Sequence, residues 1–93
     1  MNITVQLDNV ARVLSGRKEI TISVEEGATG RDVLRALVAA LPLLAQTTVD
    51  PAKGDFYSDE YWLAYEDRTG VPDLSAPLRV SDGSRLFILT GVC

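Results

Sequence analysis

Residues 19–42 read EITISVEEGATGRDVLRALVAALP, and within this stretch the hydrophobic period changes from two residues to about 3.6. In the first half, Ile20, Ile22 and Val24 alternate with polar residues, which predicts a half-buried strand over residues 19–24. In the second half, apolar residues recur every three or four positions, which is typical of a helix with one apolar face. These positions are Val33, Leu34, Leu37, Val38 and Leu41. The stretch therefore predicts a helix that packs on a sheet.

Both ends of this helix are marked in the sequence. Thr29 has a side chain that accepts a hydrogen bond from a backbone N–H at a helix start. Asp32, three residues later, lies near the positive end of the helix dipole, and the pair is a shortened variant of the capping box. Pro42 disfavours helical geometry at Leu41, so we expect the helix to begin after Thr29 and to end there.

Strands are predicted on both sides of this stretch. Residues 3–7 alternate apolar and polar side chains and should pair antiparallel with residues 19–24. Residues 61–65 form another candidate strand, and residues 86–89 are continuously apolar, as expected for a central strand.

Two later segments are less regular. Residues 45–60 are rich in turn-forming types, and we expect an irregular loop there. Pro72 and Pro77 leave room only for a short edge strand over residues 78–80.

The expected order is strand, strand, helix, strand, short strand, strand. This order predicts an α+β roll: a mixed sheet of four or five strands, the first and last parallel at its centre, with one main helix on one face. A ferredoxin-like unit would need a second helix, and no second amphipathic run exists. With 93 residues the chain is interpreted as a single domain over residues 1–93.

Composition excludes several classes of function. The net charge of −4 argues against nucleic-acid binding, which depends on clustered Lys and Arg. A single cysteine cannot form an internal disulfide, and the chain has no histidine. The longest apolar stretch, residues 36–45, is interrupted by Pro42 and is shorter than the roughly 20 residues that span a membrane. We therefore expect a cytoplasmic protein that does not bind a membrane.

Several short motifs occur along the chain in the order in which they occur in one protein family. They are NVARVLSG (residues 9–16), EGAT (26–29), DVLRAL (32–37), LPLL (41–44) and the later SDGS (81–84) with LFI (86–88). Together they resemble the MoaD/ThiS family of ubiquitin-like sulfur carriers, which act in molybdopterin and thiamine synthesis. The resemblance covers nearly the whole chain except residues 45–60, which look like an insertion. It implies a ubiquitin-like β-grasp fold.

The resemblance also points to the C-terminal residues. Family members carry sulfur on a C-terminal Gly-Gly that an activating enzyme adenylates, and glycine lets the tail pass through a narrow channel. Residues 90–93 are Thr-Gly-Val-Cys, so Gly91 and Cys93 are the candidates for a carrier terminus. The alternatives are that Gly91 only ends a strand and that Cys93, with no cationic neighbour in sequence to lower its pKa, has no role. The implied partner is a carrier-activating adenylating enzyme or a synthase large subunit.

A second candidate site lies in the last strand. Either Leu86 and Ile88 or Phe87 and Leu89 face the helix, because the strand is apolar on both sides. If Phe87 and Leu89 lie on the open side of the sheet, Trp62 or Tyr61 of the neighbouring strand can join them in an apolar patch that binds protein. The alternative is that residues 45–60 fold back and cover this patch.

Two functional hypotheses follow. The first is a non-catalytic interaction module that binds a protein partner through the open sheet face. The alternative is a sulfur carrier or protein modifier that acts through a processed C-terminus. In either case we expect no enzyme activity, cofactor or metal, because the sequence shows no nucleophile–base arrangement, no phosphate-binding glycine loop and no calcium-loop spacing.

Overall fold

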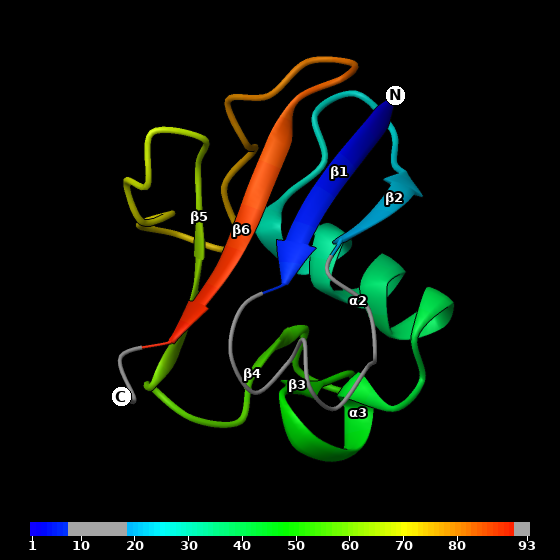
Figure 1. The fold of residues 1–93 in the computed structure, drawn as a ribbon, viewed down its shortest axis with the longest axis vertical. Helices are drawn as coiled ribbons and strands as arrows, with labels where there is room; N and C mark the ends of the chain where they lie inside the picture. Colours follow the sequence, from blue (N-terminus) through cyan, green and yellow to red (C-terminus); the bar gives the residue numbers. More distant parts are fainter. Residues whose placement is uncertain (8–18, 91–93) are drawn as a thin grey trace.

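A four-stranded mixed sheet with one main helix on one face forms the frame of the molecule (Figure 1). The structure is a computed structural model, and it describes residues 1–7 and 19–90. The strands, in their spatial order, are β2 (Glu19–Ser23), β1 (Asn2–Leu7), β6 (Arg85–Thr90) and β5 (Tyr61–Ala64). The NVARVLSG motif (residues 9–16) and the candidate terminus Gly91 and Cys93 lie outside the described residues.

Strand pairing confirms the predicted topology. β1 runs antiparallel to β2, with Val5 opposite Ile20, and parallel to β6, with Val5 opposite Leu86. β6 in turn runs antiparallel to β5, with Leu63 opposite Ile88. The first and last described strands therefore lie together at the centre of the sheet, and the α+β, β-grasp prediction is correct.

Helix α2 (Gly30–Ala40) begins as the sequence predicts. The backbone N–H of Asp32 donates to the Thr29 hydroxyl at 3.2 Å, and the N–H of Thr29 donates to the Asp32 carboxylate at 2.9 Å. This reciprocal pair is a capping box, and it satisfies two backbone donors that a helix start otherwise leaves open. Leu41 is the C-cap residue, directly before Pro42. No helix among the described residues is long and apolar enough to cross a membrane.

The hydrophobic core lies between α2 and the inner face of the sheet. Val33, Leu34 and Leu37 of the helix have no exposed area, and Leu86 and Ile88 of β6 have none either. The open question of which pair in β6 faces the helix is thereby answered. Phe87 and Leu89, which alternate with the core pair, lie on the opposite, open face.

The expectation of an irregular loop over residues 45–60 is wrong for part of that segment. The segment contains a single helical turn, α3 (Leu44–Thr47), and a two-stranded antiparallel sheet of β3 (Val49–Asp50) and β4 (Asp55–Phe56). Leu44 and Val49 are fully buried in the same core as α2 and the main sheet. The segment thus extends the core at one end, and elements of two to four residues are too short to produce a detectable hydrophobic period.

The short edge strand expected over residues 78–80 is also absent. The N–H of Leu78 donates to the carbonyl of Ala28 at 2.9 Å, and Pro77 forms an isolated antiparallel bridge with Thr29. The segment is held by the loop before α2 and not by the sheet. Its one buried apolar side chain, Leu78, joins the core, which accounts for the apolar signal that suggested a strand.

Candidate functional site

The open face of the sheet, opposite α2, is divided into an apolar half and a polar half. The apolar half comes from β5 and β6, where Trp62 lies opposite Leu89 and Ala64 lies opposite Phe87. Residues that face each other directly across two strands project to the same side of the sheet. The three patch residues predicted from the sequence, Trp62, Phe87 and Leu89, therefore share one face.

The three patch residues differ in how far they reach solvent. Trp62 is 38% exposed and Leu89 is half-buried, whereas Phe87 is only 8% exposed although it lies on the open face. The guanidinium carbon of Arg68 lies 5.0 Å from the centroid of the Phe87 ring, which is cation–π geometry. The accessible part of the patch is thus Trp62 with Leu89, and Arg68 and Phe87 form its inner border.

Arg68 is a residue that the sequence reasoning missed. It lies in the turn after β5 and has φ +68°, a left-handed conformation that is uncommon outside glycine. Its N–H donates to the Tyr65 carbonyl at 2.8 Å, and the Tyr65 N–H donates to the Thr69 carbonyl at 2.9 Å. The turn is recognisable from its Asp-Arg-Thr-Gly sequence, but no local pattern shows that the Arg68 side chain reaches Phe87.

Asp67 fixes the same turn. Its carboxylate accepts the N–H of Thr69 at 3.0 Å. Hydrogen bonds from the backbone and side chain of Thr69 lower the pKa of Asp67 below its ordinary value, and the charge of Arg79 acts in the same direction. The ionised carboxylate therefore supports the turn conformation that places Arg68 over Phe87.

The polar half of the open face is held together by its own groups. Arg85 of β6 forms an ion pair with Glu19 of β2 and donates a second hydrogen bond to Gln6 of β1 at 3.3 Å. The hydroxyls of Thr4 and Thr21 lie 3.2 Å apart. Because both members of the ion pair are partly exposed, its contribution to stability is small. This half gives the face a hydrophilic border beside the apolar patch.

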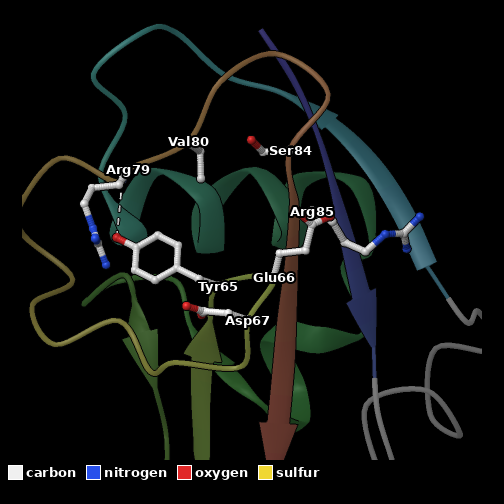
Figure 2. Close-up of a pocket in the computed structure, with 7 residues that line it drawn as sticks. All are labelled: Tyr65, Glu66, Asp67, Arg79, Val80, Ser84 and Arg85. Atoms are coloured by element: carbon white, nitrogen blue, oxygen red, sulfur yellow. Dashed lines mark hydrogen bonds between the residues drawn. The ribbon is translucent and has the colours of Figure 1, made fainter.

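A groove of about 500 Å³ lies where the turn after β5 meets the segment before β6 (Figure 2). Tyr65 lies at its centre, with the Arg79 guanidinium 4.9 Å from the ring centroid and the Arg79 backbone N–H donating to the phenol oxygen at 3.3 Å. Arg85 is paired with Glu19 and Asp67 with Thr69, so these groups already have partners within the protein. The contacts between Arg79 and Tyr65 therefore hold the segment before β6 against the end of β5. The groove is a weaker candidate for a binding site than the apolar patch.

Other chemistry finds little support among the described residues. No group of three His, Cys, Asp or Glu side chains within residues 1–7 and 19–90 is arranged to hold a metal ion.

The candidate terminus follows directly after Thr90, the last residue of β6, which lies opposite Tyr61 of β5. The apolar patch and the point where the chain leaves β6 are thus next to each other on the same two strands.

No protein-family model and no curated protein sequence matches the chain. Solved structures do match over almost its whole length. SAMP1 from Haloferax volcanii has a TM-score of 0.78 and 22% identity, covering 99% of this chain and 97% of that one. A second structure, of the small archaeal modifier protein 1 of H. volcanii, has a TM-score of 0.75 and 23% identity, covering 98% of both chains.

A third match is a putative molybdopterin converting factor, subunit 1, from Pyrococcus furiosus. Its TM-score is 0.72 at 22% identity, and the match covers 98% of both chains. At these identities the likeness establishes the fold. The matching structures include a small archaeal modifier protein and a putative molybdopterin converting factor subunit, which agrees with the MoaD/ThiS-like resemblance inferred from the motifs.

Proposed function

We propose that this chain is a small non-catalytic β-grasp protein that binds a protein partner through the apolar half of its open sheet face. The observation that carries the proposal is the exposed indole of Trp62 beside Leu89, bordered by Arg68 and by a polar half-face. Tryptophan and arginine are enriched among the residues that dominate binding energy in interfaces, and a polar rim around an apolar centre is the usual arrangement.

The partner classes to test are those implied by the sequence resemblance: a carrier-activating adenylating enzyme and a synthase large subunit from the same organism. We expect Trp62→Ala to weaken binding to one of them by about 2 kcal/mol, or roughly 30-fold, in isothermal titration calorimetry. Tyr57→Ala is the matched control, because Tyr57 is 54% exposed and its hydroxyl bonds to the Ala45 carbonyl, away from β5 and β6. Equal affinities for wild type and Trp62→Ala would contradict the proposal.

A second candidate function is supported by the solved structures that match the chain. One is a modifier protein and another a putative molybdopterin-converting subunit, and both match over nearly their full lengths. We infer from this that the segment after Thr90 is a candidate carrier of sulfur or of a covalent bond to another protein. Intact-mass spectrometry of the protein from its own cells tests this, since a sulfur in place of a terminal oxygen, or a mass ending at Gly91, favours the carrier function. An unmodified mass that includes Cys93 counts against it.

A further inference from the structure

The two edges of the sheet differ in how much backbone they leave open. At the β5 edge, the Val71 N–H donates to the Leu63 carbonyl at 2.8 Å and Gly70 forms a bridge with Ala64, so the following turn covers part of the edge. β2, at the other edge, lies beside α2 (Figure 1). Within residues 1–7 and 19–90, no strand pairs with the outer side of β2. An uncovered edge strand is a template for another strand.

The register of β2 identifies the groups that this edge presents. Val24 and Met1 exchange two hydrogen bonds, at 2.9 and 2.7 Å. Hydrogen-bonded pairs alternate along an antiparallel ladder, so Ile22 and Ile20 also bond to β1. The N–H and C=O groups of Thr21 and Ser23 therefore point away from the sheet, and both residues are exposed.

A groove of about 280 Å³ runs beside this edge, between β2 and α2. Its lining combines small apolar residues, Ala28 and Ala36, with the carboxylates of Glu25 and Asp32. Ile22, which is 5% exposed, projects to the same side of the sheet as α2. An added strand would thus place alternate apolar side chains against Ile22 and Ala36, where they continue the existing core.

We propose that the β2 edge and this groove bind an extended segment of a basic partner protein, which adds a fifth strand to the sheet. The main-chain groups of Thr21 and Ser23 supply the hydrogen bonds, and the groove supplies selectivity for alternate side chains. Charge determines the kind of partner: Glu25 and Asp32 border the groove and the chain carries a net charge of −4. A second copy of this acidic chain would bring like charges together, whereas a segment with flanking lysines complements them.

This inference goes beyond the proposed function. The β2 edge shares no residue with the patch formed by Trp62 and Leu89. Binding at one of these surfaces can therefore be disproved without affecting the proposal for the other. Trp62→Ala should leave binding at the β2 edge unchanged.

The test uses the full chain and the synthetic peptide acetyl-Lys-Val-Thr-Val-Thr-Val-Lys-amide, followed by amide hydrogen exchange in NMR spectra. At saturating peptide, we expect exchange at Thr21 and Ser23 to slow by about tenfold or more, because their N–H groups become hydrogen-bonded. Ile20 and Ile22 serve as internal controls, because their N–H groups already bond to β1. Binding without protection at Thr21 and Ser23, or no binding, would overturn the inference.

Two further comparisons test whether the groove selects its partner by charge and whether a second copy of the chain occupies the β2 edge. Glu25→Lys should weaken the lysine peptide about threefold or more, whereas Glu26→Lys, the same change at the neighbouring exposed residue outside the groove, should not. A peptide with glutamate in place of both lysines should bind more weakly than the lysine peptide. Equal binding of the two peptides, or protection of Thr21 that rises with protein concentration in the absence of peptide, would show that the edge does not select a basic partner.

Discussion

The two faces of the central sheet use the same strands for opposite purposes. On the face that α2 covers, Leu86 and Ile88 are fully buried in one continuous core. On the open face, Arg68 lies over the ring of Phe87, while Leu89 is half-buried and Trp62 is exposed. The covered face supplies stability through apolar burial, and the open face keeps an accessible apolar surface. The contrast shows that a continuous apolar strand can supply a core on one face of a sheet and leave an accessible apolar surface on the other.

The largest expected effect comes from adjacent residues of β6 that project to opposite faces. We expect Ile88→Ala to lower the free energy of unfolding by about 2–5 kcal/mol, because it removes fully buried methyl groups and leaves a cavity. Leu89→Ala should cost less than about 1 kcal/mol, because the side chain is only half-buried. Urea denaturation measures both values. Similar losses at the two positions would mean that the open face is part of the core.

A smaller effect should follow from weakening the helix that covers one face. Thr29→Ala removes the capping hydroxyl of α2 and should cost about 1 kcal/mol. Because the hydrogen bonds of the cap join Thr29 and Asp32 to each other and not to β5, the emission maximum of Trp62, the only tryptophan, should stay unchanged in the native state. Thr29→Ser, which keeps a hydroxyl, is the control. A shift in Trp62 emission would indicate that the two faces are coupled.

The contact between Arg68 and Phe87 is expected to contribute less. A double-mutant cycle with Arg68→Ala and Phe87→Leu should give a coupling energy of about 0.5–1 kcal/mol, typical of an exposed cation–π pair. Thermal or urea unfolding of the four proteins supplies the data. Additive effects of the two substitutions would show that Arg68 covers the ring without stabilising it.

The smallest expected effect is on how the stability of the protein changes at acidic pH. Because hydrogen bonds from Thr69 lower the pKa of Asp67 below 3.8 in the folded protein, the ionised carboxylate favours the fold above the ordinary pKa. That contribution is lost as the pH falls through the lowered folded pKa. Asp67→Asn should therefore make the loss of stability below about pH 4 slightly less steep, in unfolding midpoints measured against pH. Asp73, whose pKa is lowered by hydrogen bonds from Ser75, should keep its share of the acid sensitivity in this variant.

Much of the covered face could be predicted from local sequence. Alternation in residues 3–7 and 19–24 predicted two strands and the inward positions of Ile3, Val5 and Ile20, all of them buried. The Thr29–Asp32 spacing predicted the capping box at the helix start. Each of these signals depends on residues that are close together in the sequence, so it can be recognised without knowledge of the fold.

The parts that could not be predicted depend on distant partners. Leu44 lies in an apolar run after Pro42 and Val49 stands alone among turn-forming residues, and only their contacts with the core reveal α3 and β3 as ordered elements. The residues expected to form an edge strand near Leu78 bond instead to the loop before α2. Likewise, Arg68 gains its role from Phe87, which is brought beside it by the pairing of β5 with β6.

The sequence by itself determined the order of the four strands of the main sheet and of helix α2, the helix cap and the inward side of each alternating strand, because these follow from hydrophobic period and local hydrogen bonding. Only the tertiary structure decided which side of residues 86–89 faces the helix, since a strand that is apolar on both sides carries no internal preference. Pairing with the neighbouring strands sets the orientation of β6. Val5 and Leu63, each opposite a residue of the inner pair, align Leu86 and Ile88 with the core and leave Leu89 on the open face beside Trp62.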